Sequence, residues 1–62
     1  MKVYIILYRH RCDWEVQGIE KVFDSRKKAI EYLEQEMNAK HLSDGEWETE
    51  YYWYHIEEHK VE

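Results

Sequence analysis

Two histidines in the run HIEEH have a spacing that could bind a metal ion. His55 and His59 are four residues apart, which on a helix would place both imidazoles on one face. The run is not an HExxH motif, because no glutamate directly follows the first histidine. The neighbouring residues favour a strand, on which the two rings would lie roughly 13 Å apart at about 3.3 Å per residue. One ion cannot bridge that distance, so neither a metal site nor any other cofactor site is expected.

Cys12 is the only cysteine, and it could act as a nucleophile with His10 or His41 as its base. No oxyanion donor, glycine-rich turn or third catalytic group can be identified beside these residues. A free thiol in a loop is therefore the expected role of Cys12, and the chain is predicted not to be an enzyme.

The residues that could serve acid–base catalysis or phosphate binding are weaker candidates than the histidines and Cys12. Glu57, Glu58 and Glu62 are close in sequence, but no buried setting that would make them acid–base catalysts is evident. We expect them to form a solvated charge cluster. The only glycines are Gly18 and Gly45, so no phosphate-binding loop is present.

Aromatic side chains are the most distinctive feature of the composition, because 16% of the residues are Phe, Trp or Tyr. Tyr and Trp dominate the binding energy of many protein interfaces, and on a sheet they can also stack with bases. Residues 1–29 carry seven basic and four acidic side chains, whereas residues 30–62 carry two and ten. The acidic second half disfavours a nucleic-acid partner. The asymmetry permits a head-to-tail contact between copies or electrostatic attraction of a basic partner.

The length of 62 residues predicts one domain, residues 1–62, with a core too small for more than marginal stability. The missing stability should come from aromatic packing or from oligomerisation. A single cysteine and no signal peptide predict a cytoplasmic protein. No apolar run approaches the length needed to span a membrane.

One amphipathic helix is expected over residues 26–40. Asp24 and Ser25 can accept hydrogen bonds from the free amides of a first helical turn. The apolar positions recur with helical spacing. They are Ala29, Ile30, Leu33 and Met37.

The first strand is expected over residues 2–9, and both of its faces are apolar. Val3, Ile5 and Leu7 point one way, while Tyr4, Ile6 and Tyr8 point the other. A strand with one wet face should alternate apolar and polar residues, so this strand is expected at the centre of the sheet. We expect the helix to cover the aliphatic row and a second layer to cover the tyrosine row.

Two further strands are expected, over residues 14–23 and 46–55. Gly18 indicates a bulge in the second strand. Residues 41–45 should form a loop that ends in an Asp-Gly turn. The strand over 46–55 should lie at an edge of the sheet, with Trp47, Tyr51 and Trp53 on one face. Edge strands can pair with another chain.

These elements predict an α+β fold with the order β-β-α-β. The sheet should have three antiparallel strands in the order 2-1-3, with a right-handed crossover and one helix on one face. The uncovered face should then expose more apolar surface than a monomer normally shows. The predicted interface residues are Tyr4, Tyr8, Trp47, Tyr51, Tyr52, Trp53 and Tyr54.

Three segments of the sequence share a pattern with known short proteins. They are MKVYII at residues 1–6, VFDS at 22–25 with Lys28 and Ala29, and YHIEEHKV at 54–61. In these segments the sequence resembles a family of very short phage and bacterial β-β-α-β proteins of unknown function. Some small phage proteins of this size inhibit bacterial antiviral defence by binding a host protein. The resemblance implies such a role and implies no catalytic residues.

The main functional prediction is a non-enzymatic protein-binding module that forms a homodimer or larger assembly. Its partner would be a host protein of a bacterial defence system, if the family resemblance extends to function. The alternative is a binder of small ligands, nucleotides or single-stranded nucleic acid that uses an aromatic sheet face. An enzyme built around Cys12 or the histidines is the third possibility.

Overall fold

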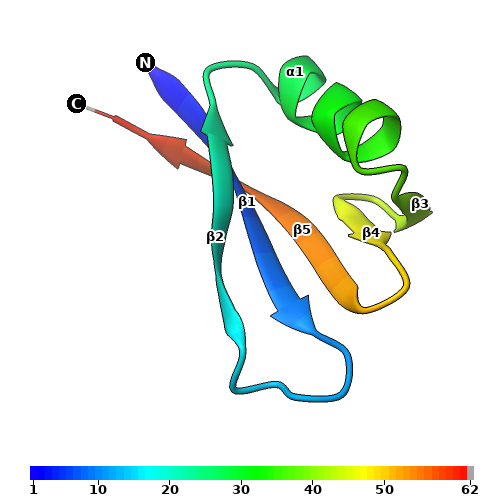
Figure 1. Cartoon of the computed structure of the whole chain (residues 1–62). Coiled ribbons are helices and arrows are strands. Elements are labelled where there is room, and N and C mark those ends of the chain that lie inside the picture. Colours follow the sequence, from blue (N-terminus) through cyan, green and yellow to red (C-terminus); the bar gives the residue numbers. More distant parts are fainter. Residues whose placement is uncertain (62) are drawn as a thin grey trace.

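The computed structural model describes residues 1–61, and its five strands form one antiparallel sheet in the order β2-β1-β5-β4-β3. A short helical segment lies across one face (Figure 1). The elements are β1 (Lys2–His10), β2 (Gln17–Phe23), α1 (Arg26–Glu31), η1 (Tyr32–Glu36), β3 (Lys40–Ser43), β4 (Glu46–Glu48) and β5 (Tyr52–Lys60). The fold is therefore α+β, but the prediction of a three-stranded sheet in the order 2-1-3 is wrong.

The segment predicted as one strand over residues 46–55 contains two strands separated by a turn. The N–H of Thr49 donates to the carbonyl of Tyr52 over 2.8 Å, and this bond closes the turn between β4 and β5. The predicted loop over 41–45 contains part of β3 and a turn at Gly45, whose φ is +79°. Because β4 and β3 add to one side of β5, β5 lies inside the sheet and not at its edge.

The helical segment begins where the sequence indicates but ends earlier than predicted. Ser25 is the N-cap, and its Oγ accepts a hydrogen bond from the N–H of Lys28. The last turn, η1, is a π-helix in which the N–H of Met37 donates to the carbonyl of Tyr32 over 3.0 Å. Asn38 then adopts a left-handed conformation with φ +57°. This residue ends the helix at the point where the chain turns into β3.

The helix covers the tyrosine row of β1, which reverses the predicted orientation. Ile6 is fully buried, and Tyr4 and Tyr8 pack against the core. Both rows of β1 are apolar, so the residue pattern of β1 alone cannot decide which row faces the helix. The neighbouring strand decides it, because Tyr54 is opposite Tyr8 in β5 and is buried on the same side.

The core is small and lies entirely between the sheet and the helical segment. It contains Ile6, Ala29, Leu33, Ala39, Trp47 and Tyr54. Trp47, the largest of these side chains, comes from the short strand β4. One layer of core on one side of the sheet is consistent with the marginal stability expected for a chain of this length.

A bulge does occur in β2, but not at Gly18. Ile6 pairs with Lys21 and Leu7 pairs with Ile19, so Glu20 is the additional residue. Gly18 pairs regularly with Tyr8, and a Cβ atom at Gly18 would lie 3.1 Å from the Tyr8 hydroxyl oxygen. The close approach of the Tyr8 side chain therefore explains why position 18 is occupied by glycine.

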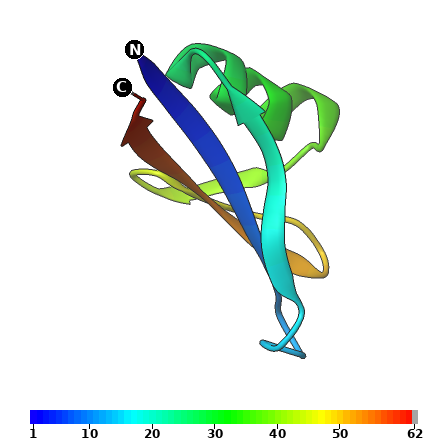
Figure 2. The same cartoon turned by 90° about the vertical axis from the view of Figure 1, so that its left-hand side faces the viewer.

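Strand β2 is shorter than predicted, because residues 11–16 form the β1–β2 loop. This loop lies at the end of the sheet that is farthest from the helical segment (Figures 1 and 2). It carries two exposed apolar side chains, Trp14 and Val16.

Candidate functional site

The face of the sheet opposite the helical segment is the main candidate for a binding surface. We call it the open face, and its residues follow from strand alternation and the strand registers. They are Val3, Ile5, Leu7 and Arg9 from β1, Gln17, Ile19 and Val22 from β2, Lys40 and Leu42 from β3, Glu46 and Glu48 from β4, and Trp53, His55, Glu57 and His59 from β5. Within residues 1–61, no second layer of secondary structure covers this face (Figures 1 and 2).

One half of the open face is aliphatic. Ile5 pairs with Val22, and Leu7 pairs with Ile19, so these side chains form adjacent cross-strand pairs. Ile19 is 59% exposed and Val22 is 49% exposed, whereas the β1 residues are half-buried by their neighbours. These four residues, with Val3, form an apolar surface that we call the aliphatic band.

A polar row runs along β5 beside the aliphatic band. Nε2 of His55 lies 3.4 Å from Oε2 of Glu57, and Nε2 of His59 lies 3.3 Å from Oε1 of the same carboxylate. Glu57 therefore bridges the two histidines, whose spacing suggested a metal site. No group of three or more His, Cys, Asp or Glu side chains in residues 1–61 is arranged to hold a metal ion.

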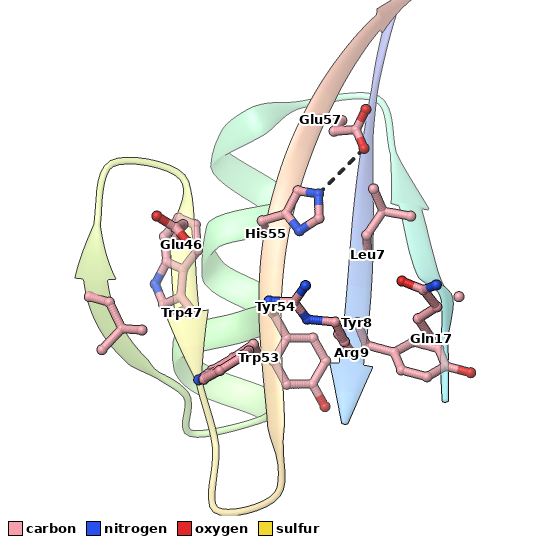
Figure 3. A pocket seen from close by; sticks show the side chains of 12 residues that line it. Leu7, Tyr8, Arg9, Gln17, Glu46, Trp47, Trp53, Tyr54, His55 and Glu57 are labelled. Atoms are coloured by element: carbon pink, nitrogen blue, oxygen red, sulfur yellow. Dashed lines mark hydrogen bonds and ion pairs between the residues drawn. The ribbon is translucent and has the colours of Figure 1, made fainter. Parts of the chain in front are cut away.

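The open face contains a hollow of about 650 Å³ (Figure 3). The side chains around it include Leu7, Leu42, Glu46, Trp53, His55 and Glu57. The guanidinium carbon of Arg9 lies 5.0 Å from the centre of the Trp53 ring, which is within the range of a cation–π interaction. Pockets for small ligands typically have volumes of roughly 300–1,000 Å³, so the hollow is large enough for a ligand or a large side chain.

The predicted interface residues do not share one surface. Trp47 and Tyr54 are buried in the core of this chain. Tyr4, Tyr8 and Tyr52 lie half-buried on the helical side of the sheet.

Two of the predicted interface residues are exposed. Trp53 lies on the open face, and Tyr51 lies in the turn before β5. The apolar contribution of β2 to this face was not predicted from the sequence. The signal was the pairing of Ile5 with Val22 on one face of the β1–β2 pair, which can be recognised only when the register is known.

The catalytic pairs considered for Cys12 are not assembled. Cys12 is exposed, and Nδ1 of His10 accepts hydrogen bonds from the backbone N–H groups of Cys12 and Asp13, each over 3.1 Å. The ring of His41 packs on Trp47 with their centres 4.8 Å apart. Both histidines therefore serve local structure.

The acidic cluster near the C-terminal end is also divided. Glu57 contacts the two histidines on the open face, whereas Glu58 lies 3.4 Å from Nζ of Lys2 in an ion pair. Glu62 lies outside the described residues.

None of the helical segments in residues 1–61 has both the length and the apolar character required to cross a membrane. No protein-family model, curated protein or solved structure matches the chain.

Proposed function

We propose that the chain is a non-enzymatic protein-binding module that self-associates through its open face. The observation that supports this proposal is the aliphatic band, which includes Ile5, Leu7, Ile19 and Val22. Antiparallel sheets with one solvated face usually present polar residues there, and stable domains cover the apolar faces of their sheets. A second copy packed on the open face would supply the missing layer.

The edges of the sheet are less suited to association than the face. At one edge, β2 carries a bulge at Glu20 followed by Lys21. At the other, β3 has four residues and a shift in register between His41 and Ser43. Bulges, lysines and short strands are features that prevent edge-to-edge pairing. We therefore propose packing of one sheet face on another.

The size of the molecule favours a partner that covers the whole face. The two longer extents of the molecule are 36 Å and 24 Å, so the outline of one face is at most about 860 Å². A standard protein interface takes about 800 Å² from each partner, so an interface of that size needs most of a face. A second copy has the same outline and can cover it, whereas a short peptide cannot.

Light scattering over a dilution series would test self-association, with Ile19→Lys and Val22→Lys as interface variants. Both side chains are exposed, so the substitutions should preserve the fold while placing a charge in the interface. The wild type should be a dimer that dissociates on dilution, and each variant should shift the equilibrium toward monomer. Gln35→Lys, at an exposed position on the helical segment, is the control and should behave as wild type.

A wild type that is monomeric at every concentration would contradict the proposal. Interface variants that associate as tightly as the wild type would contradict it as well. Circular dichroism spectra of all variants would show whether the fold is retained.

The resemblance to short phage proteins supports a second part of the proposal, in which the assembly inhibits a bacterial antiviral defence system by binding a host protein. The cytoplasm is the corresponding location, and the exposed thiol of Cys12 agrees with a reducing compartment. Expression of the chain should raise the plating efficiency of a phage that the defence system restricts. Trp53→Ala should reduce this effect if Trp53 contacts the host protein. No change in plating with the wild-type chain, across a panel of defence systems, would contradict this role.

The hollow supports a second candidate function, the binding of a small aromatic ligand. A planar ring could stack on Trp53, because aromatic stacking tolerates many ring types. The carboxylates of Glu46 and Glu57 line the hollow and disfavour phosphate groups, so an uncharged or cationic ring is preferred over a nucleotide. Titration of tryptophan fluorescence with nucleosides and nucleotides is the test. No quenching at millimolar ligand would count against this candidate.

A further inference from the structure

His55, Glu57 and His59 form a cluster on β5 that the proposed protein-binding function does not use. They occupy alternate positions of one strand, so their side chains lie on the same face of the sheet. β5 pairs with β1 on one side and, over residues 53–55, with β4 on the other. Side chains on strands are positioned more precisely than side chains on loops. The cluster therefore has a well-fixed backbone beneath it.

The distances within the cluster match those between two ligands of one metal ion. Nε2 of His55 lies 3.4 Å from Oε2 of Glu57, and Nε2 of His59 lies 3.3 Å from Oε1 of the same carboxylate. Ordinary N–H···O hydrogen bonds span about 2.7–3.2 Å. A nitrogen and an oxygen that both bind a tetrahedral zinc ion, at about 2.0–2.2 Å from it, lie roughly 3.4 Å apart. Each histidine therefore stands at the separation of a chelating pair with Glu57.

A metal ion bound at Glu57 does not meet the spacing problem of the two histidines. His55 and His59 are too far apart along a strand for one ion to bind both, but each is two residues from Glu57. An ion held by one histidine and the carboxylate has two protein ligands, and water fills its other positions. Such a site does not require a group of three metal-binding side chains, which residues 1–61 lack.

The hollow gives the pair formed by His55 and Glu57 a suitable setting. Both side chains line the hollow (Figure 3), with Leu7 and Leu42 also in its wall. Apolar walls lower the local dielectric constant and strengthen the attraction between a carboxylate and a cation. Glu46, which is opposite His55 in β4, adds a second negative charge to the wall. The volume of about 650 Å³ leaves room for the waters that complete the coordination.

The chemistry of the two ligands indicates the class of ion. Imidazole nitrogen suits Zn²⁺, Cu²⁺ and Ni²⁺, whereas Mg²⁺ and Ca²⁺ prefer oxygen ligands alone. Arg9 also lines the hollow, and its guanidinium carbon lies 5.0 Å from the centre of the Trp53 ring. This positive charge opposes a cation nearby, so we expect a modest affinity.

We propose that Nε2 of His55 and Oε2 of Glu57 bind a divalent transition-metal ion, of which Zn²⁺ is the representative, in the hollow of the open face. The site goes beyond the proposed protein-binding function and needs no second copy. If a second copy covers the open face, the coordination positions held by water face that copy.

Isothermal titration calorimetry with zinc chloride tests the site on the chain carrying Cys12→Ser. This background removes the exposed thiol, which would compete for zinc. The background chain should bind one zinc ion saturably. His55→Ala and Glu57→Gln should each weaken binding by about tenfold or more, because losing a ligand costs at least as much as losing an outer-shell partner. Glu58→Gln, at the neighbouring exposed carboxylate, is the matched control and should retain the affinity.

The second histidine tests the position of the ion. His59→Ala should weaken zinc binding less than His55→Ala does, because the ion lies on the side of Glu57 that faces the hollow. A larger loss with His59→Ala would overturn the assignment to the hollow.

Nitrogen NMR of the histidine rings locates the ligand atom without a substitution at the site. Zinc should shift the Nε2 resonance of His55 and leave the rings of His10 and His41 unchanged, because local contacts engage both of those rings. Shifts confined to His10 and His41 would overturn the site. So would the absence of saturable binding, or an unchanged affinity in His55→Ala and Glu57→Gln. Each of these results would leave the proposed self-association standing, because that proposal depends on the aliphatic band.

Discussion

The indole Nε1 of Trp47 donates a hydrogen bond to Oε2 of Glu34 over 3.0 Å, and this bond connects β4 to η1. Trp47 is the largest side chain of the core, and its strand has only three residues. The backbone pairing of β4 with β3 and β5 is therefore short, and the packing and hydrogen bond of the Trp47 side chain add to it. This relationship helps so short a strand to keep its place in the sheet.

Replacing Glu34 with alanine should destabilise the fold by about 1 kcal/mol. The substitution leaves the indole N–H without its acceptor, and an unsatisfied buried donor costs about 1–3 kcal/mol. The lower value is expected because Glu34 is exposed and water can replace part of the bond. Urea denaturation measures the change. Glu34→Gln keeps an acceptor oxygen and should recover most of the stability, whereas Glu31→Ala, at an exposed position in α1, should have little effect. Equal losses for Glu34→Ala and Glu31→Ala would show that the bond contributes nothing.

Asn38→Gly should maintain or slightly raise the stability, and Asn38→Ala should lower it by about 1 kcal/mol. Asn38 has φ +57°, a conformation that costs residues with a Cβ atom roughly 1–2 kcal/mol and glycine almost nothing. After Asn38, the N–H of Ala39 donates to the carbonyl of Leu33 over 2.8 Å, so the conformation must be kept. Thermal unfolding should show a fall in Tm of about 4–8 °C for the alanine variant. A Tm for the alanine variant at or above that of the glycine variant would contradict this account.

The protein should lose stability in alkaline solution as two tyrosines ionise. Burial raises the pKa of Tyr32, whose hydroxyl also donates to Oε2 of Glu20 over 3.1 Å, and burial likewise raises the pKa of Tyr54. Because the pKa of each tyrosine is higher in the folded than in the unfolded chain, the stabilisation is complete below about pH 10 and is lost as the pH rises through the folded pKa.

Urea denaturation between neutral and strongly alkaline pH would measure this dependence. Tyr32→Phe and Tyr54→Phe should each make the decline in stability less steep, with tyrosinate absorbance recorded in parallel. Tyr51→Phe, at an exposed position in the turn before β5, is the matched control. If both core variants decline as steeply as the wild type, ionisation of these two tyrosines is not the cause.

The features that the sequence predicted well depend on local chemistry. Ser25 caps the helix because its hydroxyl reaches the N–H of a residue three positions further on. The Asp-Gly pair indicated a turn, and Gly45 has the positive φ that such a turn requires. The α+β class and an antiparallel arrangement also followed from the pattern of strands and helix.

The features that the sequence missed depend on contacts between distant segments. Residues 46–55 are rich in aromatic residues, which favour strand, and contain no Gly, Pro, Asn or Asp, so no turn residue marked the turn at Thr49. β3 is polar and exposed, and it forms a strand because β4 pairs with it. The number of strands was therefore set by which segments pair with one another, and the strand propensity of each segment did not reveal it.

The sequence by itself determined that β1 has two apolar rows and that one helix can cover only one of them. Only the tertiary structure decided which row that is. The pairing of β1 with β5 aligns Tyr8 with Tyr54 and Leu7 with His55. Tyr54 and Trp47 are both buried on that side, with Tyr8 packed against them, so the first pair joins the largest apolar side chains of the core. This packing places the helix on the tyrosine side and leaves the aliphatic band on the open face.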